Sequence, residues 1–168
     1  MAPTDGPVRR LLVANRGEIA VRIARTARRL GIDTVGVHSD ADADALHVAV
    51  MDRSVRLAGS SPATTYLRAD LVLAAARETG CDAVHPGYGF LAENADFARQ
   101  VIDAGLRWVG PTPDQIALLG DKIAAKRAAI AAGVPTAPVF EAAPGSVPTD
   151  VPLPALVKAA AGGGGRGM

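Results

Sequence analysis

The chain has 168 residues, enough for one domain and the beginning of a second, and 49% of them are hydrophobic, as is typical of a globular protein. The 18 Lys and Arg residues balance 17 Asp and Glu residues to a formal net charge of +1, so there is no electrostatic case for nucleic acid or an anionic membrane as the main partner. The single cysteine, Cys81, excludes an internal disulfide and a cysteine-based zinc site, and no apolar run approaches the roughly 18 residues that cross a bilayer, so the sequence predicts a cytoplasmic protein.

The first part of the chain alternates short apolar runs with longer stretches of helical periodicity. In chain order, the pattern predicts a strand at residues 10–14, a helix at 18–30 that ends at Gly31, a strand at 33–38, a short strand at 55–57, a helix at 65–79 that ends at Gly80, a strand at 81–85, a helix at 92–104 that ends at Gly105, and a strand at 106–109.

This alternation is typical of an α/β fold, and the predicted architecture is a Rossmann-like parallel sheet with helices on both faces. The predicted strands are almost continuously apolar, as burial on two sides requires. Ligands of such sheets bind outside the carboxyl ends of the strands. The segments expected at that edge are 15–18, 38–40 and 86–89.

The pattern changes after Gly110 and Pro111. It predicts short helices at 112–119 and 122–132, an extended segment at 134–140, a loop at 142–154 and a short strand at 155–159. We therefore expect one domain over residues 1–133 and the beginning of a second over residues 134–168.

A run of glycines near the end of the chain is the sharpest candidate for a ligand site. The segment reads Gly162, Gly163, Gly164, Gly165, Arg166, Gly167 and Met168. Consecutive glycines disfavour helices and strands, but they let backbone N–H groups surround a phosphate, and the ammonium group of Lys158 could reach the same phosphates. The segment is not a P-loop, because Met168 stands where the lysine should be. A flexible linker is the alternative interpretation.

A second glycine motif follows the predicted strand at 81–85. Residues 87–92, Gly-Tyr-Gly-Phe-Leu-Ala, fit the dinucleotide pattern G-x-G-x-x-A. That pattern belongs to the first strand–helix turn of a Rossmann fold, which here reads Asn-Arg-Gly-Glu instead. A turn that brings Tyr88 and His85 to the edge of the sheet is therefore favoured over a dinucleotide site.

Taken in order, several strings strongly resemble one enzyme family, biotin carboxylase. They are LLVANRGEIAVRIARTARRLGIDTVGVHSDAD, HPGYGFLAEN, WVGPTP, GDKIAAKRAA, GVPTAP and VKAAAGGGGRGM. The resemblance extends from residue 10 to residue 168, and ANRGEIA and HPGYGFLAEN are long, specific strings.

The resemblance implies a Rossmann-like domain that leads into an ATP-grasp fold, of which only an incomplete beginning is present. It implies an enzyme that uses ATP and Mg²⁺ to activate bicarbonate through carboxyphosphate and then carboxylates biotin on a carrier domain or protein. An acyl-CoA carboxylase is the expected context, with a carboxyltransferase subunit as a further partner.

The resemblance also assigns roles to residues. Lys122, Lys158 and the glycine run from Gly162 to Met168 would contact ATP. Tyr88, Gly87, Gly89 and His85 would contact biotin, and Arg22 and Arg25 would lie at a homodimer interface. Without the resemblance, the favoured interpretation of Lys122 and these arginines is that they are solvated surface residues.

The family's Mg²⁺-binding carboxylates and catalytic residues are expected beyond residue 168, so no catalytic or metal-binding residue is predicted here and the isolated chain is expected to be inactive. Two alternatives stay open from the sequence. One is a pyruvate or urea carboxylase, and the other is a non-catalytic module for dimerisation or regulation.

Overall fold

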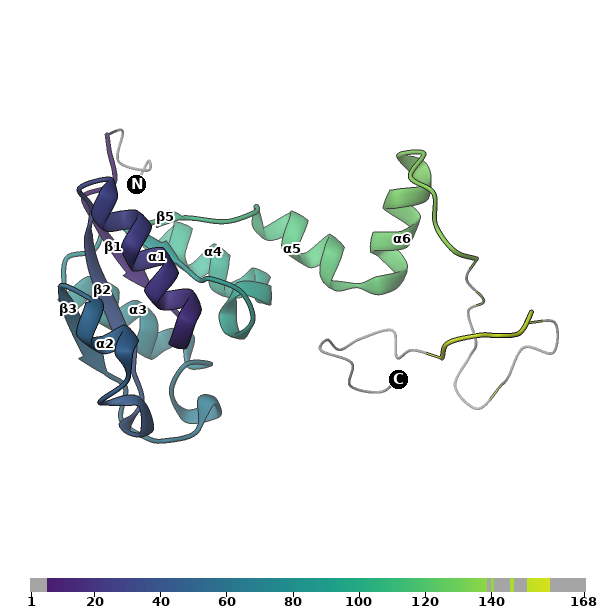
Figure 1. The fold of residues 1–168 in the computed structure, drawn as a ribbon. Helices are drawn as coiled ribbons and strands as arrows, with labels where there is room; N and C mark the ends of the chain where they lie inside the picture. Colours follow the sequence, from purple (N-terminus) through teal and green to yellow (C-terminus); the bar gives the residue numbers. More distant parts are fainter. Residues whose placement is uncertain (1–5, 139, 141–145, 147–150, 158–168) are drawn as a thin grey trace. The chain divides into compact units, whose positions relative to one another are not determined.

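The structure of the chain is a computed structural model that describes residues 6–138, 140, 146 and 151–157 (Figure 1). It divides into two compact units, Met1–Ile116 and Ala117–Met168. The first unit contains a five-stranded sheet. The predicted domain boundary at residue 133 stays a prediction.

The strands of the sheet are β1 (Arg10–Val13), β2 (Asp33–His38), β3 (Arg53–Arg56), β4 (Ala83–His85) and β5 (Arg107–Trp108). The helices between them are α1 (Gly17–Arg29), α2 (Leu46–Val50), α3 (Ala69–Glu78) and α4 (Ala95–Asp103). Three short 3-10 helices, η1 (Asp40–Asp42), η2 (Pro62–Thr64) and η3 (Phe90–Glu93), lie in the connections. After β5 come α5 (Pro113–Gly120) and α6 (Lys122–Ala131).

All neighbouring strands of the sheet are parallel, in the order β3-β2-β1-β4-β5. The chain runs outward from β1 through β2 to β3, crosses back through α3, and runs outward in the opposite direction through β4 and β5. The strand order therefore reverses between β1 and β4. This topology confirms the predicted α/β fold with a Rossmann-like parallel sheet.

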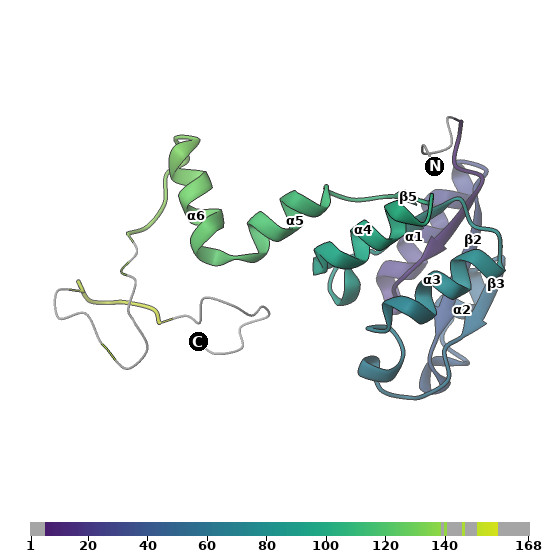
Figure 2. The same cartoon turned by 180° about the vertical axis from the view of Figure 1, so that it is seen from behind.

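Helices cover both faces of the sheet, as predicted (Figures 1 and 2). Leu11 and Val13 of β1 pack in one buried cluster with α1, whereas the alternate residue Leu12 packs in the other cluster with α3 and α4. Successive strand residues point to opposite faces, so this single strand contributes to both halves of the core.

Glycine ends the helices where the sequence predicts it. Gly31 after α1 and Gly80 after α3 have φ values of +70° and +65°, the left-handed conformation that glycine adopts without strain. At α1, the Ile32 N–H donates to the Ala27 carbonyl at 3.0 Å and the Gly31 N–H donates to the Arg28 carbonyl at 3.1 Å. This pair of bonds is a Schellman motif, which satisfies the last carbonyls of the helix and redirects the chain into β2.

The helices that follow long connections begin later than predicted. The predicted helix at 92–104 begins at Ala95, because η3 occupies the preceding residues and the Asn94 side chain caps α4 by accepting the Phe97 N–H at 3.0 Å. The predicted helix at 65–79 begins at Ala69, after η2. The short helix α2 was not predicted, because five residues are too few to show a helical period.

The described part of the second unit has no core of its own. None of its side chains is buried, and α6 is held at its start by Asp121, whose side chain accepts the Ile123 and Ala124 N–H groups at 2.8 Å each. The predicted strand at 155–159 is wrong for its described residues, 155–157, which are not in a strand. A β-strand forms by pairing with a neighbour, and the described residues of this unit contain no other strand. Lys158 and residue 159 lie outside the described residues.

No helix in the described residues is both long enough and apolar enough to cross a membrane.

We predict that the Phe97→Ala substitution lowers the free energy of unfolding by about 3–5 kcal/mol, because it leaves a cavity in the core. Phe97 is fully buried and packs edge-on against Trp108, with ring centroids 5.7 Å apart. Urea unfolding followed by circular dichroism measures the change. The matched control is Ile102→Ala on the same helix, at a side chain that is 45% exposed, with an expected cost of about 1 kcal/mol. Equal losses in the two variants would contradict this account of the core.

Candidate functional site

The candidate site lies at the carboxyl edge of the sheet, where the strand order reverses between β1 and β4. Open parallel sheets form a crevice at such a point, because the connections on either side leave in opposite directions. β1 leads here into Asn15 and the start of α1, and β4 leads into the turn formed by residues 86–89. Two of the three segments that the sequence places at this edge therefore meet at the reversal.

Asn15 connects these two segments. Its side chain is buried, and its Nδ2 group donates hydrogen bonds to the Pro86 carbonyl at 2.7 Å and to the Tyr88 carbonyl at 2.9 Å. Its Oδ1 atom accepts the Arg16 N–H at 2.9 Å. One side chain therefore satisfies polar backbone groups on both sides of the sheet's reversal.

The four residues predicted to contact biotin are His85, the last residue of β4, and three residues of this turn, Gly87, Tyr88 and Gly89. Gly87 and Gly89 have φ values of +68° and +67°, and the Gly87 N–H donates to His85 Nδ1 at 3.0 Å. Burial lowers the pKa of His85, so the imidazole is neutral at pH 7 and can accept that bond. The structure thus brings His85, Gly87, Tyr88 and Gly89 together at the edge of the sheet, while their contact with biotin stays a prediction.

Tyr88 presents an exposed ring beside the start of α1. The residue is 62% exposed, and its hydroxyl group donates to Glu18 Oε1 at 2.5 Å. The hydrogen bond to Glu18 and the negative charge of that carboxylate raise the pKa of Tyr88. The phenol therefore remains a protonated donor to Glu18 across the physiological range.

Asp42, at the end of η1, gathers three donors next to this turn. Arg16 Nη1 lies 2.8 Å from both of its carboxylate oxygens, and the Tyr66 hydroxyl donates to Oδ2 at 2.6 Å. The Ser39 hydroxyl donates to the same oxygen at 3.0 Å. Burial alone would raise the pKa of this carboxyl, but the three donors outweigh burial and hold the pKa of Asp42 below its usual value.

Tyr66 links the Asp42 cluster to the far end of the turn. Its ring stacks on Phe90 with centroids 5.4 Å apart, and the Arg16 guanidinium lies 5.9 Å from its centroid. Phe90 has a φ of +46°, a conformation that costs a non-glycine residue about 1–3 kcal/mol. The stacking on Tyr66 contributes about 0.5–1.5 kcal/mol and so offsets part of this strain, and backbone strain of this kind is concentrated at functional sites.

A hollow of about 470 Å³ adjoins Tyr88 and the start of α1. It is lined by Asn15, Arg16, Gly17, Glu18, Ile19, Asp42, Ala45, His47, Tyr88, Gly89 and Phe90. His47 is buried, its Nε2 lies 3.3 Å from the Val37 carbonyl and must donate to it, and its Nδ1 has no hydrogen-bond partner among the described residues. The charged side chains of the lining are already paired, Arg16 with Asp42 and Glu18 with the Tyr88 hydroxyl group, whereas His47 Nδ1 is not, so the hollow suits a neutral ligand better than a strongly charged one.

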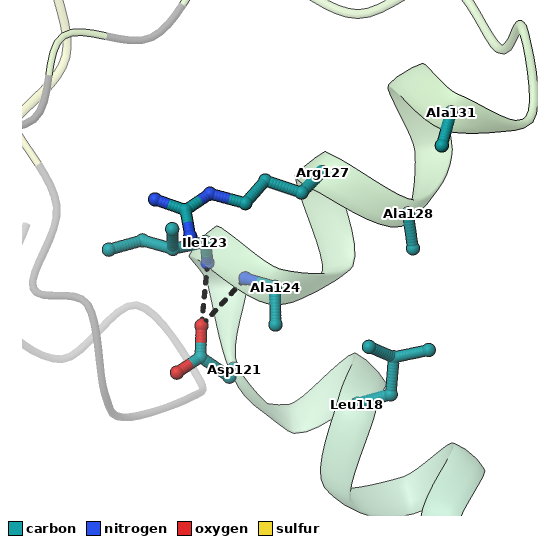
Figure 3. Close-up of a pocket in the computed structure, with 7 residues that line it drawn as sticks. All are labelled: Leu118, Asp121, Ile123, Ala124, Arg127, Ala128 and Ala131. Carbon is teal, nitrogen blue, oxygen red and sulfur yellow. Dashed lines mark hydrogen bonds between the residues drawn. The ribbon is translucent and has the colours of Figure 1, made fainter.

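Of the predicted ATP contacts, the structure describes only Lys122. It is the first residue of α6 and is exposed, directly after the capping residue Asp121. A neighbouring hollow of about 630 Å³ is lined mainly by apolar side chains of α6 and by Leu118, and Figure 3 shows Ala124 and Ala128 pointing toward Leu118. Lys158, Gly162, Gly163, Gly164, Gly165, Arg166, Gly167 and Met168 lie outside the described residues.

The predicted dimer residues Arg22 and Arg25 lie on α1, and both are exposed. Ala20, Val21, Ile23, Ala24 and Ala27 are the buried residues of this helix. The face that carries the arginines is therefore not used by the core of the first unit, and its role in a dimer stays a prediction.

The described residues contain no group of three or more His, Cys, Asp or Glu side chains that could hold a metal ion.

Several residues of the site were not predicted as functional, among them Asn15, Glu18, Asp42 and Tyr66. Asn15 was placed at the sheet edge, and its position directly after a buried strand was a usable signal. Asp42, in η1, and Tyr66, in the connection after η2, lie 24 positions apart, and no spacing rule indicates that they form a hydrogen bond.

Comparisons with known proteins show which family the chain resembles. Residues 7–116 match the family described as "Biotin carboxylase, N-terminal domain". A biotin carboxylase from Pseudomonas aeruginosa is 51% identical over 170 residues, which cover 95% of this chain and 37% of that protein. The mitochondrial methylcrotonoyl-CoA carboxylase subunit alpha from Oryza sativa is 49% identical, with 96% of this chain and 23% of that protein covered. The chain therefore spans well under half the length of these curated relatives.

Solved structures show the same fold. The biotin carboxylase domain of a single-chain bacterial carboxylase superposes with a TM-score of 0.74 at 49% identity, covering 77% of this chain and 30% of that chain. The urea carboxylase of Kluyveromyces lactis superposes with a TM-score of 0.77 at 48% identity, covering 79% of this chain and 12% of that chain.

We predict that Asp42→Asn lowers the free energy of unfolding at pH 7 by about 1–3 kcal/mol, because the Arg16 ion pair is lost at a side chain that is only 15% exposed. The pKa of Asp42 is lower in the folded chain than in the unfolded chain, so its stabilising contribution is present above about pH 4 and is lost as the pH falls below that value. Urea unfolding at pH 7 and at pH 3 measures both effects, and the two proteins should be closer in stability at pH 3.

The control for this experiment is Asp96→Asn, which removes a carboxylate whose side chain is 81% exposed in a surface pair with Arg99. Its expected effect is within about 0.5 kcal/mol. An Asp42→Asn variant with a stability gap that stays constant from pH 7 to pH 3 would contradict the electrostatic role of Asp42.

Proposed function

The chain belongs to the biotin carboxylase family, and on this premise we propose that it forms the N-terminal part of an enzyme that uses ATP and bicarbonate to carboxylate biotin on a carrier protein or domain. The proposed context is an acyl-CoA carboxylase. The relatives include subunits of methylcrotonoyl-CoA and propionyl-CoA carboxylases, and a matched solved structure is a long-chain acyl-CoA carboxylase.

The observation that carries the proposal is the Tyr88 turn at the reversal of the sheet. The exposed Tyr88 is held there by two hydrogen bonds, one that its backbone carbonyl accepts from Asn15 Nδ2 and one that its hydroxyl group donates to Glu18, next to a hollow of about 470 Å³. Biotin has a flat, uncharged ureido ring, and such a ring is recognised by an aromatic face together with a few placed polar groups. Tyr88 would contact the ring, and Gly87, Gly89 and His85 would shape the turn.

The ATP half of the proposal rests on two lysines and the glycine run. Phosphoryl transfer needs positioned cations and backbone N–H groups that neutralise charge on the phosphates. Lys122, at the start of α6, and Lys158 would supply the ammonium groups, and Gly162 to Gly167, with Arg166 and Met168, would supply the enclosing loop. Closure of that loop would exclude water from the activated bicarbonate. Mg²⁺ would complete the neutralisation, held by residues outside this chain.

The proposed partners follow from the reaction. A carrier must deliver biotin to the Tyr88 turn, and a carboxyltransferase subunit must accept the carboxylated product. A homodimer through α1 is proposed because Arg22 and Arg25 are exposed on a face that the core does not use. A cytoplasmic location is part of the same proposal, although the relatives include mitochondrial subunits as well as bacterial biotin carboxylases.

We predict that replacing Lys122 and Lys158 together by methionine, in the complete carboxylase that the proposal requires, lowers kcat by about 100-fold or more, because each amine would stabilise charge that develops on the phosphates. Biotin-dependent ATP hydrolysis measures the effect. The control is Lys126→Met, four residues further along α6, where the amine donates to the Ala137 carbonyl. Turnover that is unchanged by the double substitution would refute the proposed ATP site.

We also predict that the isolated 168-residue chain binds MgATP more weakly than micromolar, because most of the adenine pocket is expected elsewhere in the enzyme. Isothermal titration calorimetry measures this directly. Micromolar affinity of the isolated chain would show that the nucleotide site is complete within it.

A further inference from the structure

Asn15 is placed and paired in a way that only an asparagine side chain satisfies. It is 3% exposed, both of its Nδ2 hydrogen bonds go to carbonyl groups of the opposite segment, and its Oδ1 accepts a backbone N–H of its own segment. Aspartate has the same shape but no donor, so it would place a carboxylate oxygen against the Pro86 and Tyr88 carbonyls.

Gly87 fits against this amide without any room for a side chain. A Cβ atom at Gly87 would lie 2.7 Å from Asn15 Nδ2 and 3.2 Å from Asn15 Cβ, and the backbone φ is +68°. The peptide between the two carbonyl acceptors is therefore packed directly on the Asn15 side chain. Its position follows that of Asn15 closely, because neither partner has space to move toward the other.

The segment that contains Asn15 binds Tyr88 at two points, its backbone carbonyl and its hydroxyl group. Asn15 binds its carbonyl oxygen, and Glu18, three residues later on the first turn of α1, accepts the hydrogen bond of its hydroxyl group. The ring lies between these two attachments, and the residue is 62% exposed. An exposed aromatic side chain normally samples several rotamers, whereas one attached at both ends is held in a single orientation before any ligand binds.

We propose that Asn15 is a positioning residue, which together with Glu18 fixes Tyr88 in one orientation for contact with the ureido ring of biotin. The inference rests on the proposed biotin role of Tyr88. Asn15 makes no contact with the substrate itself, and its effect passes through the turn. Loss of the Asn15 donors would leave Tyr88 present but free to reorient, so biotin binding would weaken while the ATP reaction stayed intact.

The first experiment tests whether Asn15 fixes the orientation of Tyr88. It uses the 168-residue chain with 3-fluorotyrosine incorporated for ¹⁹F NMR. The chain has two tyrosines, and Tyr66 is buried whereas Tyr88 is exposed, so their resonances differ and Tyr88→Phe assigns them. We expect Asn15→Asp to move the Tyr88 resonance toward that of free fluorotyrosine and to lower the pH at which it titrates. The Tyr66 resonance should stay in place, which reports that the fold is retained.

Asn94→Ala is the matched control. Asn94 is the other asparagine of the chain, and its side chain caps α4 through the Phe97 N–H. This variant also removes a hydrogen bond between an asparagine side chain and the backbone, but Asn94 makes no hydrogen bond to Tyr88. The Tyr88 resonance should therefore not change. An Asn15→Asp variant with the wild-type Tyr88 resonance and titration would overturn the inference.

The consequence for the substrate is tested in the complete carboxylase by steady-state kinetics. We expect Asn15→Asp to raise the KM for biotin about tenfold while kcat and the KM for ATP stay within about twofold, a division that general destabilisation would not produce. Because Asn15 acts through Tyr88, adding Asn15→Asp to Tyr88→Ala should raise that KM no further. Fully additive effects would overturn the inference.

A further variant covers the case in which Asn15→Asp does not fold. Glu18→Ala removes the other attachment at an exposed side chain, and we expect it to shift the Tyr88 resonance and to raise the KM for biotin about threefold. No change in either measurement would overturn the inference. If Tyr88→Ala itself left the KM for biotin unchanged, the proposed biotin role would fail, and with it the kinetic half of the inference. The NMR result would show separately whether the attachment exists.

Discussion

The buried amide of Asn15 joins the two connections that leave the sheet in opposite directions. β1 and β4 are neighbours in space but are separated by about 70 residues of chain, and their hydrogen-bond ladder ends at the edge of the sheet. Beyond that edge, the Asn15 side chain continues the connection by bonding the Pro86 and Tyr88 carbonyls. The left-handed Gly87 and the exposed Tyr88 ring both depend on this attachment. One side chain thus holds the two segments of the site together at the point where the strand order reverses.

Next to the turn, the strained backbone of Phe90 is accompanied by side-chain contacts that stabilise it. Phe90 holds an unfavourable backbone conformation, and its ring is packed on Tyr66, whose hydroxyl group donates to Asp42. Asp42 in turn pairs with Arg16, the residue that follows Asn15. The strained backbone at Phe90 and the Asn15 side chain that binds the turn are therefore connected through the hydrogen bonds of Asp42. Because the pKa of Asp42 is held below its usual value, the Asp42 cluster stabilises the folded chain most when this carboxylate is ionised.

Most of the fold could be predicted from periodicity and glycine placement, because these are local signals. The strand at 33–38 was predicted with its observed bounds, and Gly31, Gly80 and Gly105 end helices as expected. The short helices could not be predicted, since α2 has five residues and η2 has three, too few to show a helical period. The site was predicted in part: Tyr88, His85 and the two glycines were placed in one turn at the sheet edge, but the residues that hold the turn were not identified as functional.

The sequence by itself determined the alternation of strands and helices, the carboxyl-edge position of the Tyr88 turn and, through its specific strings, the family. Only the tertiary structure decided where the strand order reverses, and hence that Asn15 faces residues 86–88. It also decided that Asp42 and Tyr66 share a hydrogen bond. The physical reason is that helix and strand propensities act over a few neighbouring residues, whereas strand order and contacts between loops depend on how distant segments pack around a common core.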